Sequence, residues 1–207
     1  IGLGIVGGLQ GIVGWWMVTS GLSQEPTVSQ YRLAIHLFIA LGIFTCLIWL
    51  GHSLFLGTSR IQFQIPIFVF VLIFLTIIAG AFVAGMNAGL LYNQFPLMGD
   101  SFIPVEYGEK GLLDPFENPA SAQFHHRWLA LITFCGVLFL WRSAIKAKIA
   151  IKQANLMLII VFGQFILGIL TLVNAAPVHL GAMHQTGAIL LTAISISVIH
   201  SLYRVSE

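Results

Sequence analysis

The sequence predicts an all-α integral membrane protein whose chain crosses the bilayer six times. Of its 207 residues, 58% are hydrophobic and only 8% are charged, whereas soluble domains carry roughly 25% charged residues. The mean hydropathy is +0.96, and the apolar residues gather in runs of the length, about 20 residues, that spans the hydrocarbon of a bilayer as a helix. These observations exclude a soluble globular domain and give no reason to expect a nucleic-acid partner.

The six predicted membrane helices correspond to six apolar runs, taken in chain order. The first run starts apolar without a cationic segment ahead of it, so it is not a signal peptide, and we expect the chain to begin within a larger protein. Polar or short segments separate the runs, and the longest is the loop 90–125. The predicted spans are 1–19, 32–51, 66–89, 126–145, 154–174 and 182–203.

Charge predicts the orientation of these helices, because cations collect on the cytoplasmic or matrix side of a membrane protein. One side carries six cations: Arg60, Arg142, Lys146, Lys148, Lys152 and Arg204. The other side carries the acidic residues, with Lys110 as its loop cation: Glu25, Asp100, Glu106, Glu109, Asp114 and Glu117. The loop 90–125 is therefore predicted to face outward.

Three histidines are predicted to lie at one depth near the outer face. His36 opens the second span, His126 the fourth and His184 the sixth, and these three helices run from outside to inside. Ionisable residues in membrane spans usually face the bundle interior and mark a functional site. We interpret His52 and His200, near the inner end, as bystanders.

An internal repeat relates the two halves of the chain. The segment QGIVG (10–14) matches QFILG (164–168), and RLAIHLFIAL (32–41) aligns with LGAMHQTGAI (180–189), which pairs His36 with His184. The repeat predicts two homologous helical bundles. Residues 1–65 would hold the last two helices of the first bundle, residues 66–207 a complete four-helix bundle, and two further helices are expected ahead of residue 1.

Histidines on separate helices of a bundle are typical of a haem site, because haem iron takes two axial ligands and a bundle core accepts the apolar macrocycle. Arg127, next to His126, and Arg32, four residues before His36, would meet the haem propionates at the polar edge. A zinc site is a weaker alternative, since zinc takes three or four converging ligands and the spans contain no carboxylate. An ion or proton pathway is disfavoured for the same lack.

Five segments together resemble the heme A synthase family of bacterial and mitochondrial inner membranes. They follow the order of the family's motifs over nearly the whole chain: GLQGIVGWWMVTSGL, VSQYRLAIHL, AGMNAGLLYNQFPLMGD, NPASAQFHHRWLA and LGAMHQTGAILL. The resemblance implies eight membrane helices in two pseudo-symmetric four-helix bundles, of which this chain carries six helices.

The resemblance also implies a reaction and its residues. Family members oxidise a methyl group of heme O to the formyl group of heme A by successive hydroxylations. The C-terminal bundle would hold haem b on His126 and His184, with Arg127 beside it, and the N-terminal bundle would take the substrate haem at His36 and Arg32. The family motif Asn-His-Arg-Trp stands here as residues 125–128, with a histidine in place of the asparagine, so the ligand is His126 by motif register and its neighbour stays an alternative.

The family's essential glutamate, in a Glu-x-x-His-Arg loop, is not found in this sequence, and Gln123 takes the equivalent position in the second half. We therefore expect no catalytic residue within these 207 residues and no activity from them alone.

The implied partners are heme O, heme A, membrane lipid, heme O synthase, cytochrome oxidase subunits and a second copy of the chain. The implied location is the bacterial cell membrane or the mitochondrial inner membrane. A haem-b electron-transfer protein and an oxidase assembly factor without catalysis remain alternative functions.

Overall fold

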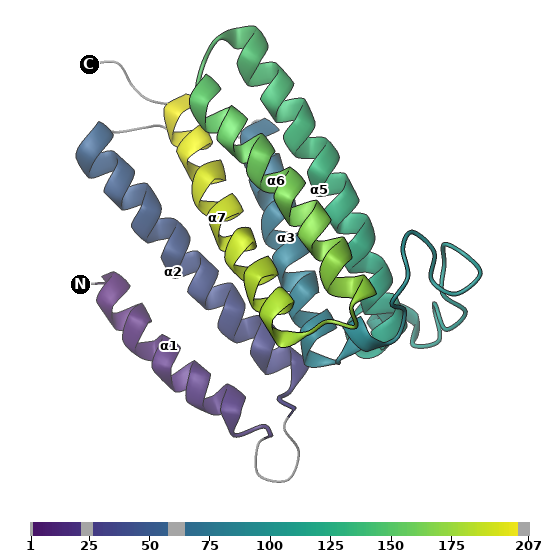
Figure 1. The fold of residues 1–207 in the computed structure, drawn as a ribbon. Helices are drawn as coiled ribbons and strands as arrows, with labels where there is room; N and C mark the ends of the chain where they lie inside the picture. Colours follow the sequence, from purple (N-terminus) through teal and green to yellow (C-terminus); the bar gives the residue numbers. More distant parts are fainter. Residues whose placement is uncertain (1, 22–26, 58–64, 203–207) are drawn as a thin grey trace. The chain divides into compact units, whose positions relative to one another are not determined.

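The structure is a computed structural model that describes residues 2–21, 27–57 and 65–202. Helices make up the regular structure of these residues, apart from an isolated bridge between Met98 and Ser101. Figure 1 follows the helices along the chain. Their bounds are α1 Gly2–Val18, α2 Gln30–Leu56, α3 Ile65–Gly85, η1 Ala88–Leu90, η2 Gly111–Leu113, α4 Asp114–Glu117, α5 Pro119–Ala147, α6 Ile151–Val173 and α7 Val178–Leu202.

Five of the described helices are long and apolar enough to cross a membrane: α2, α3, α5, α6 and α7. The remaining predicted span, 1–19, corresponds to α1, which has 17 residues. A helix of this length measures about 25 Å, slightly less than the hydrocarbon core of about 30 Å. The protein is thus an all-α membrane protein, as predicted. The residues Glu25, Arg60 and Arg204, on which part of the predicted orientation depends, lie outside the described residues.

The predicted start of the fourth span, residue 126, is wrong because α5 begins at Pro119. Asn118 caps this helix: its Oδ1 accepts hydrogen bonds from the amides of Ala120 at 3.0 Å and Ser121 at 3.3 Å. Asparagine is a preferred cap and proline a preferred first helical residue. Hydropathy alone assigned this polar stretch to the loop, which in fact ends at Asn118.

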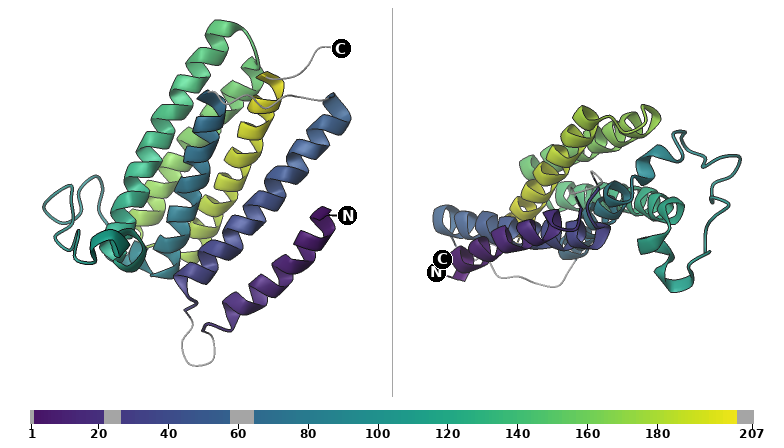
Figure 2. Two further views of the ribbon diagram at one scale, coloured as in Figure 1. Left: turned by 180° about the vertical axis from the view of Figure 1, so that it is seen from behind. Right: turned by 90° about the horizontal axis from the view of Figure 1, so that it is seen from below.

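The chain forms two compact units, and the first contains α1, the starts of α2 and α5, the ends of α3 and α6, and the outer loop. Its core is built from small and aromatic side chains of α2, α3 and the start of α5, namely Ala34, Ala81, Phe82 and Ala122. The loop that follows η1 extends beside the start of α5 (Figure 2), whereas α1 contributes no buried residue. The segments of unit 1 are Ile1–Phe44, Ile77–Arg127 and Leu172–Ala175.

The second unit contains the remaining lengths of α2, α3, α5 and α6, together with α7. Phe134 of α5 packs against the rings of Phe162 and Phe165 of α6 at centroid distances of 4.8 and 5.1 Å. Thr76 of α3 and Thr133 of α5 share a hydrogen bond of 2.7 Å. The segments of unit 2 are Thr45–Thr76, Trp128–Thr171 and Ala176–Glu207. The predicted division at residue 65 into two bundles stays a prediction.

Large apolar side chains are exposed along the helices. Leu54 and Phe55 on α2 are 73% and 88% exposed, and Ile159 on α6 is 68% exposed. Such a surface would be unfavourable in water but suits contact with lipid chains. This agrees with a protein that crosses the membrane several times.

Candidate functional site

The three candidate histidines occupy matching positions in their helices. His36 and His184 follow the first residues of α2 and α7 by six positions (30 to 36 and 178 to 184), and His126 follows the first residue of α5 by seven (119 to 126). The helices begin two, seven and four residues before the predicted span starts at 32, 126 and 182, so the histidines lie further inside their helices than predicted. Their common place along the helices is nevertheless the one predicted. All three side chains are half-buried.

Each of these imidazoles rests on a glycine of the preceding long helix. A Cβ built on Gly14 would lie 3.0 Å from Cε1 of His36, and one built on Gly168 would lie 3.0 Å from Cε1 of His184. The third contact, from Gly80 to Cε1 of His126, would be 3.1 Å. Any other residue would need the ring to shift. The backbone of one helix therefore fixes how the histidine of the next is placed.

We call each glycine with the imidazole that rests on it a seat. At two of the three seats, a glutamine also binds the histidine, as the repeat indicated. Gln10 Nε2 donates a hydrogen bond of 2.9 Å to the carbonyl oxygen of His36, and Gln164 Nε2 donates one of 2.8 Å to that of His184. Each glutamine stands one turn before the glycine on which the ring rests. The local equivalence of the two sequence repeats is thus confirmed in contacts. The corresponding position before Gly80 is Thr76, so the third seat lacks the glutamine.

His125 lies in a different environment from its neighbour His126. Its Nδ1 is 2.8 Å from the carbonyl oxygen of Ser121, one turn earlier, and 3.3 Å from the Ser121 hydroxyl. Its ring stacks on Tyr107 with centroids 5.6 Å apart and an interplanar angle of 26°. These contacts occupy His125 with the outer loop, whereas His126 shares the glycine seat of the other two candidates.

The two arginines predicted to meet propionates bind backbone carbonyl groups and an aromatic ring. Arg127 donates from Nη1 and Nη2 to carbonyl oxygens of the loop segment 92–97, at Tyr92 (2.8 Å), Gln94 (3.1 Å) and Leu97 (3.1 Å). Its buried Nε has no hydrogen-bond partner among the described residues.

Arg32 makes a comparable contact with the end of α1. Its Nη1 donates to the Trp16 carbonyl oxygen at 2.7 Å, and its guanidinium lies 4.6 Å from the centroid of the Trp16 ring. Sequence reasoning missed both of these contacts, because they depend on how loops fold back.

The buried Asp114 organises the outer loop beside α5. Only 3% of its surface is exposed, and its carboxylate accepts hydrogen bonds from the amides of Gly108 (2.8 Å) and Lys110 (3.0 Å) and from Asn118 Nδ2 (3.0 Å). Burial alone would raise the pKa of Asp114, but these bonds, together with one from Ser121, lower it to about 2. The carboxylate therefore stays charged and holds the loop against the cap of α5.

Gln123, which the sequence comparison of the two halves predicts to take the place of a glutamate, is buried in this region. Its Nε2 donates to the carbonyl oxygens of Ala88 (3.0 Å) and Tyr92 (3.2 Å). The amide thus ties α5 to the start of the outer loop.

His52 of α2 and His200 of α7 form a pair of neighbouring histidines in unit 2. The rings of His52 and His200 have centroids 5.4 Å apart, Trp49 packs on His200 at 5.2 Å, and Nε2 of His52 is 2.8 Å from the Ser197 hydroxyl. Sequence reasoning treated both histidines as separate bystanders because it cannot align the faces of helices so far apart in the chain. In the described part of the chain, no three His, Cys, Asp or Glu side chains converge as a metal site would require.

The described residues thus define a helical membrane protein in which three half-buried histidines, on three different helices, each rest on a glycine. The chain belongs to the COX15-CtaA family, described as cytochrome oxidase assembly protein, whose model matches residues 1–196.

Several relatives of this chain are named Heme A synthase. That of Parvibaculum lavamentivorans is 40% identical over 96% of this chain, that of Caulobacter vibrioides 38% identical over 92%, and that of Maricaulis maris 40% identical over 92%. The chain spans 58–59% of the length of these relatives. No solved structure matches it significantly.

Proposed function

We propose that the protein acts as a heme A synthase, which oxidises a methyl group of heme O to the formyl group of heme A by successive hydroxylations. Three independent features support this function. They are the family membership, the names of relatives up to 40% identical, and the three histidines seated alike on glycines. The histidine seats are the observation that carries the proposal, because they connect the family's chemistry to residues of this chain.

His126 and His184 are the proposed axial ligands of a haem b. The residues suit this group: Gly80 and Gly168 hold the two imidazoles by their Cε1 edges, so each ring is oriented before a ligand binds. A haem held by two imidazoles supplies reversible one-electron chemistry. Arg127 keeps one buried donor, Nε, beyond those that hold the loop, and this donor is proposed to face a propionate.

His36 and Arg32 are the proposed binding residues for the substrate haem. Nδ1 of His36 is buried without a hydrogen-bond partner among the described residues, and its Nε2 lies 3.4 Å from Gln10 Nε2. At that distance the amide contact is weak, so the ring can exchange it for iron. A weakly held imidazole suits a ligand that must enter as heme O and leave as heme A.

The proposed location is the bacterial cell membrane, since the named relatives are bacterial. Heme O synthase would supply the substrate and cytochrome oxidase subunits would receive the product, with a homo-oligomer as a further proposed assembly.

The test is to supply full-length protein with heme O in membranes and to separate the extracted haems by chromatography. We expect heme A to accumulate with the wild-type protein and not with a membrane that lacks it. A stable haem b spectrum without heme A would support the electron-transfer alternative instead, and co-purification with oxidase subunits without turnover would support the assembly factor.

The ligand assignment has a matched pair of variants in neighbouring positions. His126→Ala should convert the low-spin haem b spectrum to high spin or abolish it. His125→Ala should leave that spectrum nearly unchanged, because its ring is bound to Ser121 and Tyr107. The reverse pattern would place the ligand at His125.

A further inference from the structure

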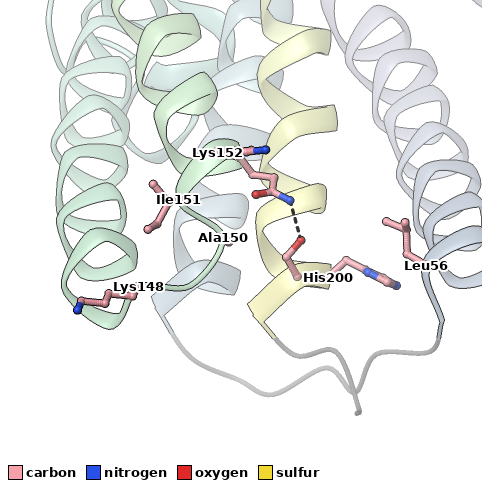
Figure 3. Close-up of a pocket in the computed structure, with 8 residues that line it drawn as sticks. Leu56, Lys148, Ala150, Ile151, Lys152 and His200 are labelled. Atoms are coloured by element: carbon pink, nitrogen blue, oxygen red, sulfur yellow. Dashed lines mark hydrogen bonds between the residues drawn. The ribbon is translucent and has the colours of Figure 1, made fainter. Parts of the chain in front are cut away.

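A pocket of about 370 Å³ lies in unit 2, at the end of the molecule where α5 turns into α6 (Figure 3). Its walls come from the last residue of α2, the α5–α6 turn, the first turn of α6 and the last turn of α7. The lining residues are Leu56, Lys148, Ala150, Ile151, Lys152, Gln153, His200 and Ser201. None of the functional residues proposed above lines it.

The chemistry of the lining favours an anion. Lys148 and Lys152 supply two cations, and no carboxylate is among the lining residues. The first amides of a helix have no acceptor within it and carry the positive end of its dipole, and α6 begins with the lining residue Ile151. Lysine side chains beside free amides form an environment that binds phosphate groups.

The α5–α6 turn is held in a specific conformation at this pocket. Lys148 and Ala150 adopt left-handed backbone angles, φ 58° and 54°, that residues other than glycine rarely take. The turn is tied to the end of α5 by hydrogen bonds from the amides of Lys148 to Ile145 O (3.2 Å) and of Ile149 to Ala144 O (3.1 Å). The left-handed angle at Lys148 and the two hydrogen bonds back to α5 are the usual way in which a helix ends, and they fix where the turn that lines the pocket leaves α5.

A hydrogen bond and ring contacts join the helices at this pocket. Gln153 Nε2 donates a hydrogen bond of 3.2 Å to the Ser201 hydroxyl, which joins α6 to α7, and Figure 3 shows this bond beside His200. His200 is fully buried, and its ring packs edge-on against those of Trp49 and His52. These contacts connect α7 with both α6 and α2 beside the pocket.

We propose that this pocket binds the phosphate group of an anionic phospholipid. The cation distribution of the sequence predicts that this end faces the cytoplasm, at the depth of the inner headgroups. Leu56 and Ile151, both exposed, would lie along the first carbons of the acyl chains, while Lys152 and the start of α6 hold the phosphate. Basic pockets between membrane helices on the cytoplasmic side bind anionic headgroups in this way.

The two lysines are expected to contribute unequally. Lys152 belongs to the first turn of α6, where side chain and helix dipole act on the same ligand. Lys148 stands on the turn, and in Figure 3 its side chain extends away from His200, so its ammonium must swing over the pocket to reach a headgroup.

The test is native mass spectrometry of full-length protein titrated with phosphatidylglycerol, with phosphatidylcholine, and with inorganic phosphate. We expect phosphatidylglycerol to stay bound preferentially and inorganic phosphate to compete weakly. Replacing the lysines should weaken phosphatidylglycerol binding by about fivefold for each charge lost, with Lys152→Ala having the larger effect. Lys146→Ala is the matched control, because that exposed lysine ends α5 but does not line the pocket.

Retention of both lipids to the same extent would overturn the proposal, and so would unchanged phosphatidylglycerol binding in the Lys148→Ala, Lys152→Ala double variant. Inorganic phosphate that binds as tightly as the lipid would overturn the lipid as the source of the phosphate. Lys152→Arg keeps the charge and should restore binding, which separates loss of charge from misfolding. These outcomes do not depend on heme A formation, so the proposal can fail while the proposed function holds.

Discussion

The seats of His36 and His184 share a glycine, a glutamine and a histidine but differ in the residue three positions after the histidine, which is Ile39 at the first seat and Gly187 at the second. In both, a glycine supports the ring and a glutamine amide binds the histidine carbonyl oxygen. At the His36 seat, Nε2 of Gln10 also comes within 3.4 Å of the ring Nε2.

One residue of the aligned repeat decides how much room the glutamine side chain has. At the His184 seat, Oε1 of Gln164 lies so close to Gly187 that any Cβ there would collide with it. The aligned position in the first repeat is Ile39, whose branched side chain leaves no such room. We infer that Gly187 gives Oε1 of Gln164 a place that Ile39 denies to Oε1 of Gln10.

The comparison teaches how one motif can serve two kinds of haem binding. At the His36 seat, an amide 3.4 Å from the ring Nε2 can give way to a ligand that enters and leaves. At the His184 seat, a glutamine held against Gly187 has a fixed place, which favours a ligand that stays. This matches the proposed exchange of heme O at His36 and the proposed permanent haem b at His184.

Filling the glycine seats should have the largest effect. Gly168→Val places a branched side chain 3.0 Å or less from the His184 ring, and overpacking of about 1–3 kcal/mol should lower haem b content about tenfold or more. The control is Gly163→Val on the same helix, where nothing lies within 4 Å of an added Cβ. The pyridine haemochrome assay measures both, and equal loss in the two variants would show that the seat has no special role.

Adding a methyl group at Gly187, where the two repeats differ, should have the next largest effect. Gly187→Ala must displace the Gln164 side chain, at a cost of about 1–3 kcal/mol. It should also change the haem b midpoint potential, because the displaced Gln164 binds the carbonyl oxygen of the proposed ligand His184. The control Gly181→Ala, also on α7, adds its Cβ to open space and should not lower the thermal unfolding temperature. A Gly187→Ala protein with unaltered potential and stability would refute the role assigned to Gly187.

Removing the glutamines should have a smaller effect. Gln164→Ala and Gln10→Ala each delete a hydrogen bond to a histidine carbonyl oxygen, which is worth about 1 kcal/mol. Denaturant unfolding in detergent should show similar losses for both. Gln10→Ala should also tighten heme O binding, because Gln10 Nε2 lies 3.4 Å from Nε2 of the His36 ring; unchanged heme O binding in this variant would argue against competition by the amide.

The smallest effect concerns the outer loop, from which the helix of His126 starts and which Asp114 holds in place. Because the pKa of Asp114 lies at about 2 in the folded loop, below its ordinary value of 3.8, its stabilisation is complete above about pH 4. It is lost as the pH falls toward 2. Pepsin should cleave the loop progressively faster from pH 4 to pH 2 in the wild-type protein. In Asp114→Asn, cleavage should be fast throughout; an equally protected loop in that variant would contradict the assigned role.

The sequence predicted the helices well because long apolar runs leave little choice to a chain in lipid. It missed the start of α5, since the cap at Asn118 and the seven helical residues before His126, PASAQFH, mix polar and small residues and do not form an apolar run. The seats of His36 and His184 were indicated by the Gln and Gly repeat. The seat at Gly80 was not, because Thr76 replaces the glutamine there. Contacts such as Arg127 with the loop carbonyl groups depend on how a long segment folds back, which no local pattern encodes.

His36 and His184 are proposed to serve different haems, and measuring both haem b and heme A in a variant of each histidine tests this division. Full-length His36→Ala and His184→Ala proteins are compared for their haem b spectrum and for heme A formed from supplied heme O. We predict that His36→Ala keeps the low-spin haem b spectrum and makes no heme A, whereas His184→Ala loses that spectrum. If His36→Ala loses haem b while still converting heme O, the roles of the two sites are reversed and the account is wrong.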